Sequence, residues 1–143
     1  EKNWAVISAE LKLVKGIKKN LKNIANSHIE YRKEKHPLEY PNAGSIFKNV
    51  DFRKVTLKIQ KLFLDKVKKD PFLIIPSAWF IIGAGLAGKK IGQAQISKKH
   101  SNYIVNLGGA KAKDVLKLVE LIKKKVKNKY NIELEIEVQF IGL

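Results

Sequence analysis

Side chains that could transfer a proton occur in two parts of this sequence. Ser45 directly follows Gly44 in residues 41–49, PNAGSIFKN. A serine held between a proline-marked loop and an apolar strand can turn its hydroxyl toward a cleft, but this weak acid gives up a proton only when positioning and charge assist it. Near the end of the chain, three glutamates of one parity alternate with apolar residues: Glu133, Glu135 and Glu137. Residue types alone do not distinguish these groups from a turn serine and a solvated row of carboxylates.

Three glycines, Gly83, Gly85 and Gly88, have the spacing GxGxxG. In dinucleotide-binding folds such glycines let a helix N-terminus approach a pyrophosphate. The context here differs, because Lys89 and Lys90 follow where an apolar helix should begin, and no second strand ends in an acid about twenty residues later. We interpret the pattern as the end of a helix followed by a glycine-rich turn.

The chain is strongly basic, with a net charge of +16 over 143 residues. Such a charge fits a polyanionic partner. However, only Arg32 and Arg53 are arginines, and sites that read bases or grip phosphate with two hydrogen bonds favour arginine. We interpret the charge as a lysine-rich surface that also suits an anionic ligand such as a diphosphate. A basic module that binds nucleic acid is an alternative.

Composition also excludes several classes of site. There is no cysteine, which rules out disulfides and thiolate metal sites. His28, His36 and His100 are not spaced as helical metal ligands, so we expect no metal site. No signal peptide is visible. Residues 71–88 carry no charge, but prolines and glycines interrupt them. We therefore expect a short strand or loop and then a buried helical turn, not a membrane span.

Apolar spacing predicts the elements that must position these residues. Strands are expected over residues 4–14, 46–48, 93–97, 103–107 and 132–141, and helices over residues 17–35, 52–69 and 111–129. In the last strand the apolar side chains point one way and the glutamates the other. This order predicts an α+β domain with a small mixed sheet packed with helices. Because the chain opens at Glu1 and lacks methionine, we expect it to be part of a longer protein.

Four segments resemble, in order, the signature segments of one enzyme family, the UDP-N-acetylenolpyruvoylglucosamine reductases, also called UDP-N-acetylmuramate dehydrogenases. Residues 42–49 resemble its NAGS-(F/I/V)-FKN signature. Residues 76–92 resemble P-(A/S)-AW…AGLKGxxIG, residues 94–106 resemble AQVSxKHxNFIVN, and residues 134–142 resemble LEPEVRxIG. The resemblance covers residues 30–143, and four motifs in register are more specific than any one of them.

The resemblance implies a catalytic role for two residues. Ser45 matches the family's proton donor. Glu137 matches its catalytic glutamate, which acts on the developing enolate either as a protonated hydrogen-bond donor or by assisting proton delivery. Gln139 stands where the family usually has arginine, and Ile136 where it usually has proline.

Three further residues match substrate-binding positions of the family. Asn49 matches a residue that contacts the nucleotide, and His100 a polar position that contacts the substrate. Lys35 is matched to a residue that meets the diphosphate, with Lys33 as its rival. No residue of this chain is assigned to cofactor binding.

The resemblance implies the C-terminal part of an NADPH- and FAD-dependent oxidoreductase. Such a flavoprotein converts UDP-N-acetylenolpyruvoylglucosamine to UDP-N-acetylmuramate in cytoplasmic peptidoglycan synthesis, and so serves cell wall biogenesis, cell shape and cell division. The expected partners are the UDP-sugar and the flavin-binding domain of the same protein, with neither nucleic acid nor membrane. A catalytically degenerate paralogue, suggested by Gln139, is an alternative.

The resemblance also predicts the domain organisation. We expect residues 1–16 to be the tail strand of a preceding flavin-binding domain that is otherwise absent, and residues 17–143 to form the substrate-binding domain. The FAD is expected to be bound mainly by the upstream domain, so this chain alone should neither hold flavin firmly nor turn over substrate.

Overall fold

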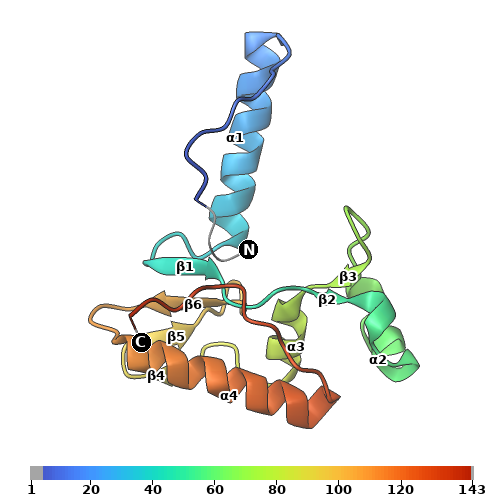
Figure 1. The fold of residues 1–143 in the computed structure, drawn as a ribbon, viewed down its shortest axis with the longest axis vertical. Helices are drawn as coiled ribbons and strands as arrows, with labels where there is room; N and C mark the ends of the chain where they lie inside the picture. The colour runs from blue at the N-terminus through green and yellow to red at the C-terminus, as the bar shows by residue number, and fades with distance from the viewer. Residues whose placement is uncertain (1–4, 143) are drawn as a thin grey trace.

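A four-stranded antiparallel sheet with one long helix against it forms the centre of the molecule (Figure 1), in a computed structural model that describes residues 5–142. In chain order the elements are α1 (Lys18–Lys35), β1 (Asn42–Ser45), β2 (Val50–Asp51), α2 (Leu57–Leu62), β3 (Ile74–Ile75), α3 (Ser77–Gly83), β4 (Lys90–Ile91), β5 (Ala94–Ile96), β6 (Tyr103–Asn106) and α4 (Ala112–Tyr130). Short 3-10 turns, Phe52–Lys54 and Leu64–Lys66, flank α2.

The main sheet has the strand order β1-β6-β5-β4, and β2 pairs with β3 in a separate ribbon. Every described strand pair is antiparallel. The predicted α+β class is therefore confirmed, but the expected mixed sheet is not found. The reason lies in the connections: β4, β5 and β6 are joined by short turns, and such turns impose antiparallel neighbours.

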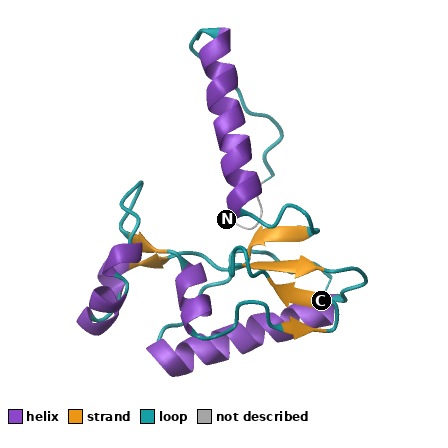
Figure 2. Cartoon of the chain, turned by 180° about the vertical axis from the view of Figure 1, so that it is seen from behind, coloured by secondary structure: helices purple, strands orange, loops and turns teal. Residues whose placement is uncertain are grey.

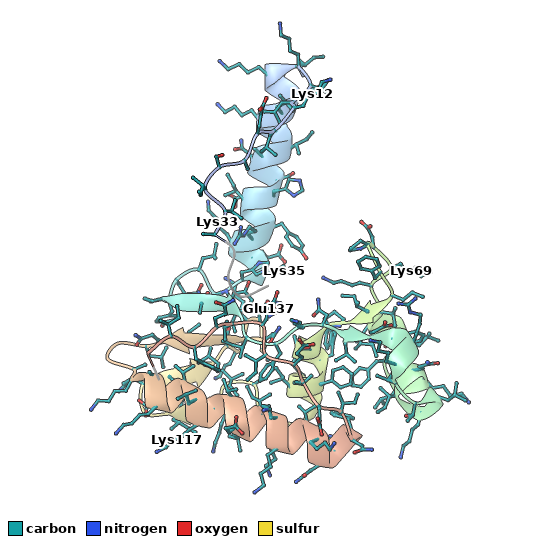
Figure 3. All side chains as sticks on the ribbon, in the orientation of Figure 1. Lys12, Lys33, Lys35, Lys69, Lys117 and Glu137 are labelled. Atoms are coloured by element: carbon teal, nitrogen blue, oxygen red, sulfur yellow. The ribbon has the colours of Figure 1, made fainter. Side chains whose placement is uncertain are left out.

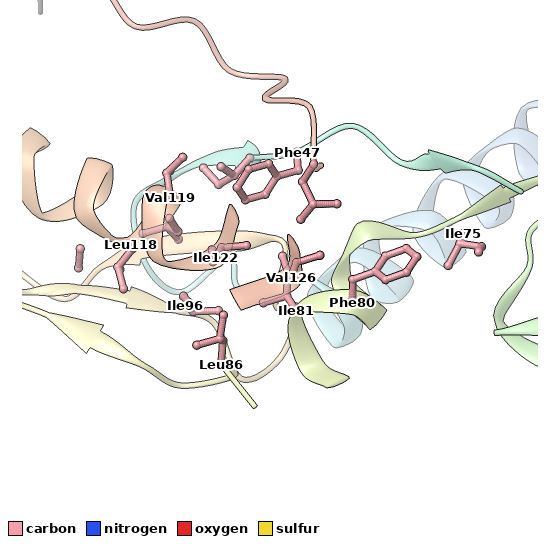
Figure 4. Packing of buried hydrophobic residues seen from close by; sticks show 14 of the residues in the cluster. Phe47, Ile75, Phe80, Ile81, Leu86, Ile96, Leu118, Val119, Ile122 and Val126 are labelled. Carbon is pink, nitrogen blue, oxygen red and sulfur yellow. The ribbon is translucent and has the colours of Figure 1, made fainter. Parts of the chain in front are cut away.

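Helix α4 covers one face of the sheet and supplies much of the core (Figure 4). Its apolar positions recur at helical spacing, so they share one face. The four enclosed ones are Leu118, Val119, Ile122 and Val126. They pack with Phe47, Phe80 and Ile96, all 0% exposed. Each such side chain contributes about 1.5–3 kcal/mol on burial. The helix ends at Asn131, whose left-handed φ of 56° caps it, as its position after the last apolar residue predicts.

Helix α1 extends away from this body (Figures 1 and 2) and buries none of its residues. Before it, residues 5–17 form neither helix nor strand and are exposed. The strand predicted over residues 4–14 is thus not found in the described residues, because a strand needs a neighbour to receive its hydrogen bonds. Residues 1–4 and 143, which the predicted domains include, lie outside the described part of the chain.

Other expectations met mixed outcomes. The predicted helix over residues 52–69 is reduced to α2 and its flanking turns. Residues 71–88 form β3 and α3, as expected.

The strand predicted over residues 132–141 is only an isolated bridge between Ile136 and Phe47. Its alternation is nevertheless real for residues 132–138, where apolar residues face inward and glutamates outward. Within residues 5–142, no helix has both the length and the apolar character needed to cross a membrane.

Candidate functional site

The chain around Ser45 is shaped by an unusual strand start. The side-chain Oδ1 of Asn42 accepts a hydrogen bond from the N–H of Gly44 (3.0 Å), and Gly44 has a φ of +80°. Along β1 the paired residues Asn42 and Ser45 are three apart, whereas their partners Val105 and Tyr103 on β6 are two apart. The extra residue is a β-bulge, which bends a strand and redirects side chains. The motif therefore sets the direction of Ser45.

Ser45 lies on the face of the sheet opposite α4. On β6, Ile104 is 5% exposed and belongs to the core beneath the sheet. Its neighbour Tyr103 must point to the other face, because side chains alternate along a strand. Ser45 is the ladder partner of Tyr103, and opposed residues share a face. Helix α1 and the C-terminal segment lie on this side (Figure 1), and Ser45 is half-buried there.

The C-terminal segment brings Glu137 to this serine. Phe47 and Ile136 form an antiparallel bridge. Beside it, the backbone N–H of Glu137 donates to the carbonyl of Ile46 (2.8 Å), the residue after Ser45. Figure 3 draws Glu137 on the same side, below the end of α1. One backbone hydrogen bond thus joins Glu137 to the residue next to Ser45, although the two segments are far apart in the sequence.

Ion pairing distinguishes the three glutamates of the last segment. Glu133 pairs with Lys127 at 2.5 Å, and Glu135 pairs with Lys48. The carboxylate of Glu137 has no ion pair among the described residues and is exposed. The structure therefore singles out Glu137 as the unengaged carboxylate, a choice that parity alone could not make.

Asn102 fixes the segment that follows Ser45, a role that the sequence reasoning missed. Its side chain accepts from the N–H of Phe47 (3.0 Å) and donates to the carbonyl of Phe47 (2.8 Å). Its own carbonyl accepts from the N–H of Ile46 (2.9 Å). Asn102 is 3% exposed, and thus replaces a strand partner for residues 46–47. The signal available in the sequence was an asparagine just before the apolar strand β6.

Asn49 lies at the start of α3, beyond the residues that Asn102 fixes. Its Oδ1 accepts from the N–H of Ser77 (3.3 Å), and Ser77 in turn donates its hydroxyl to the carbonyl of Lys48. None of the described residues accepts a hydrogen bond from the amide nitrogen of Asn49. Asn49 is exposed, so its NH₂ group can reach a ligand while its oxygen holds the loop.

The two candidate lysines lie in the last turn of α1. Lys35 pairs with Glu34 at 2.5 Å, and this hydrogen bond raises the pKa of Lys35 and lowers that of Glu34. Lys33 pairs with Glu30 at 2.9 Å, and its carbonyl accepts from the ammonium of Lys99 (2.5 Å). Both lysine side chains are exposed. The geometry does not choose between them.

His100 is half-buried just before β6 and contacts Tyr103, with ring centroids 4.7 Å apart. Burial lowers the pKa of His100, and the nearby charge of His36 lowers it further. A neutral imidazole offers one hydrogen-bond donor and one acceptor. Because Tyr103 is opposite Ser45, His100 belongs to the same face of the sheet.

Ser45, Glu137 and His100 lie on an open face, whereas Asn49 lines a hollow of about 360 Å³ together with Lys48 and Glu135. A hollow of about 600 Å³ lies elsewhere, beside α4 and lined by Lys123, Lys127 and Glu133 among others. It contains neither Ser45 nor Glu137. The face around Ser45 is the better candidate site, because it carries a hydroxyl, a carboxylate without an ion pair among the described residues and an imidazole whose pKa is lowered, the groups that proton transfer and polar recognition require.

The GxGxxG segment lies away from this face. It forms the end of a helix and a glycine-rich turn, as interpreted from the sequence. Gly83 ends α3, and Gly85 and Gly88 have φ values of +73° and +79°. No helix begins there, since β4 follows. A phosphate cradle needs the free N–H groups of a helix N-terminus, so these residues do not fit a dinucleotide.

The two departures from the family pattern are of different kinds. Beside Ile136, the bridging hydrogen bonds are donated by the N–H groups of Lys48 and Glu137. Position 136 supplies neither donor, so proline and isoleucine are both compatible with the bridge. Gln139 is exposed, and no described residue hydrogen-bonds to its side chain.

Comparison with known proteins gives one consistent family. Residues 36–141 match the model of the UDP-N-acetylenolpyruvoylglucosamine reductase, C-terminal domain. Over 139 residues, 97% of the chain, the sequence is 42% identical to the UDP-N-acetylenolpyruvoylglucosamine reductase of Fervidobacterium nodosum and 37% identical to that of Clostridium novyi. A crystal structure of the UDP-N-acetylenolpyruvylglucosamine reductase from Thermus caldophilus superposes with a TM-score of 0.56 at 30% identity, over 90% of this chain and 38% of that one. The chain likewise spans 38% of both curated relatives.

Proposed function

This chain belongs to the UDP-N-acetylenolpyruvoylglucosamine reductase family, and from that premise we propose that it is the substrate-binding part of a reductase that acts on UDP-N-acetylenolpyruvoylglucosamine. The whole enzyme is an oxidoreductase of peptidoglycan precursor synthesis and yields UDP-N-acetylmuramate. The observation that carries the proposal is the hydrogen bond from the backbone N–H of Glu137 to the carbonyl of Ile46, the residue that follows Ser45.

Ser45 is the proposed proton donor. Reduction adds a hydride to the enolpyruvyl double bond, which leaves carbanion or enolate character beside a carboxylate, and this carbon needs a proton. The bulge in β1 sets the face of the sheet to which the Ser45 side chain points, and Asn102 holds the residues that follow. Such positioning is what a weak acid requires, because proton transfer depends first on geometry.

Glu137 is proposed to act on the same enolate. It can donate a hydrogen bond in its protonated form or assist delivery of the proton from Ser45. Its lack of an ion pair among the described residues favours this role, because a carboxylate already paired with lysine is held in its charged form.

The substrate is proposed to lie across the face that these residues share. Asn49 binds the nucleotide with its amide NH₂ group, and His100 contacts the substrate as a neutral imidazole. Lys35, or its rival Lys33, meets the diphosphate from the end of α1. An isolated lysine acts on phosphate as a point charge, so the exposed position of both suits this role.

A preceding flavin-binding part of the same protein is proposed to complete the site. When bound there, FAD reduced by NADPH supplies the hydride.

The GxGxxG turn of this chain offers no phosphate-binding site for FAD, whereas α1 offers a surface for a neighbouring domain. Its exposed apolar residues include Leu21, Ile24 and Ile29, 49–54% exposed, and Ile17 directly before the helix is 70% exposed. A lone helix gains most of its stability from packing an apolar face, so this face suits a neighbouring domain. The resemblance implies that the enzyme works in the cytoplasm.

The test uses the full-length protein, loaded with flavin. NADPH oxidation is followed with and without UDP-N-acetylenolpyruvoylglucosamine. Oxidation that depends on the sugar nucleotide supports the proposal, and a separately expressed chain of residues 1–143 should show none. A flavin-loaded enzyme that ignores the sugar nucleotide would instead favour the degenerate paralogue and direct attention to Gln139.

A further inference from the structure

We propose that His36 is a positioning residue, whose imidazole stacks on that of His100 and fixes His100 toward the bound substrate. His36 is the first residue after α1. The two ring centroids are 5.5 Å apart and the ring planes differ by 15°. This inference rests on the proposed function, in which His100 contacts the UDP-sugar.

Packing against the rings of His36 and Tyr103 orients His100. Nδ1 of His36 and Nδ1 of His100 are both enclosed without a hydrogen-bond partner in residues 5–142, and no side chain of the described residues hydrogen-bonds to either imidazole. Enclosed imidazoles are usually oriented by hydrogen bonds. Because no side chain fixes the two imidazoles by a hydrogen bond, removal of the His36 ring takes away one of the two rings that hold His100 and lets it turn more freely.

Tyr103 holds the histidine pair against the sheet. Its ring meets His36 edge-on at 5.5 Å and His100 edge-on at 4.7 Å. Tyr103 is also the ladder partner of Ser45. The two stacked histidines therefore contact the residue that is paired with the proposed proton donor. They lie on the face that the substrate is proposed to occupy.

The backbone places His36 before any ligand arrives. Its N–H donates to the carbonyl of Arg32 (2.9 Å), and its own carbonyl accepts from the N–H of Leu38 (2.9 Å). Pro37, between them, is buried and restricts the chain further. His36 thus joins α1 to the sheet, and its ring has a rigid base from which to hold His100.

The test compares four forms of the full-length, flavin-loaded enzyme: wild type, His36→Ala, His100→Ala and the double variant. We expect His36→Ala to raise KM for the UDP-sugar about tenfold with kcat within about twofold, because binding is weakened without loss of a reacting group. In the His100→Ala background, His36→Ala should add nothing, because the ring that it positions is gone. His36→Phe keeps a flat ring in the stack and should restore KM to within about twofold of wild type.

His28→Ala is the matched control, since His28 is an exposed histidine of α1, and its KM should equal that of wild type. An equal effect of His36→Ala in both backgrounds overturns the positioning role and leaves the role of His100 intact. A His100→Ala variant with unchanged KM overturns both histidine assignments. A wild-type enzyme that does not turn over the UDP-sugar overturns the proposed function itself, and this inference with it.

Discussion

At the scale of residues, the choice among the three C-terminal glutamates depends on partners that are remote in the sequence. Alternation predicts that Glu133, Glu135 and Glu137 point outward together, and they do. It cannot predict which one is unengaged, because the lysines that pair with the first two come from α4 and from the segment after β1. The family resemblance selects Glu137, and Glu137 is also the one of the three without an ion pair among the described residues.

Glu137→Gln should lower kcat of the full-length reductase by about 100-fold or more, which is the usual contribution of a positioned acid or base. The amide keeps the size of the side chain but cannot gain or lose the proton. Glu135→Gln is the control, because it removes only an exposed ion pair with Lys48 and should change kcat less than about twofold. Equal losses in the two variants would remove the special role of Glu137.

His100 should make the folded chain less stable in mild acid. Burial, and next the charge of His36, lower its pKa from the usual 6.5. The unfolded chain then binds the proton at a higher pH than the folded chain, so this contribution is complete above about pH 6.5 and is lost as the pH falls below that value. The urea midpoint of the chain should therefore fall between about pH 7.5 and about pH 5.5, and fall less in His100→Phe. A variant with the same pH dependence as wild type would contradict this.

At the scale of elements, prediction succeeded where the pattern is local. The apolar stripe of α4 and its end at Asn131 follow from spacing within one segment, and so do β5 and β6. It failed where an element needs a partner from elsewhere. Residues 46–48 and 132–141 were expected as strands, but in the structure they share a single isolated bridge between Phe47 and Ile136, and the N–H of Ile46 donates to the carbonyl of Asn102.

Asn102 should prove essential to the position of Phe47 beside the C-terminal segment, because its amide hydrogen-bonds to both backbone groups of Phe47. Asn102→Leu, of similar size, leaves them enclosed and unpaired, at a cost of about 2–4 kcal/mol in the free energy of unfolding. Urea unfolding of the chain measures this. Asn128→Leu, at an exposed site on α4, should change stability by less than about 0.5 kcal/mol. A loss no larger at Asn102 than at Asn128 would show that the contact is dispensable.

At the level of the whole molecule, the predicted division of the chain at residue 17 stays a prediction, and both the family model and α1 bear on it. The model begins at residue 36, directly after α1, whereas the predicted substrate-binding domain begins at residue 17. Sequence periodicity identified the helix but not its neighbour, because an amphipathic helix looks alike whichever domain it covers.

We therefore expect α1 to gain protection in the full-length protein. Its amide hydrogens should exchange rapidly in the chain of residues 1–143, because none of its residues is buried. When the preceding part of the protein covers α1, their exchange should be slower by about tenfold or more. Hydrogen exchange read by mass spectrometry compares the two, with α4 as the internal reference. Equal exchange of α1 in both would mean that no domain packs on it.

The net charge of +16 is a further property of the whole chain. In the proposed function it attracts an anionic sugar nucleotide. A nucleic-acid-binding module would instead show affinity for DNA that falls steeply with salt, beyond what a generic cation shows.

Ser45 is proposed to deliver the proton to the reduced substrate, and the most direct measurement isolates that half of the reaction. In the full-length enzyme, flavin is reduced with NADPH, the UDP-sugar is then added, and reoxidation of the flavin is followed in wild type and Ser45→Ala by stopped flow. We predict that reoxidation slows by about 100-fold or more, while reduction by NADPH is unchanged. Reoxidation at the wild-type rate in Ser45→Ala would contradict the role of Ser45 as proton donor.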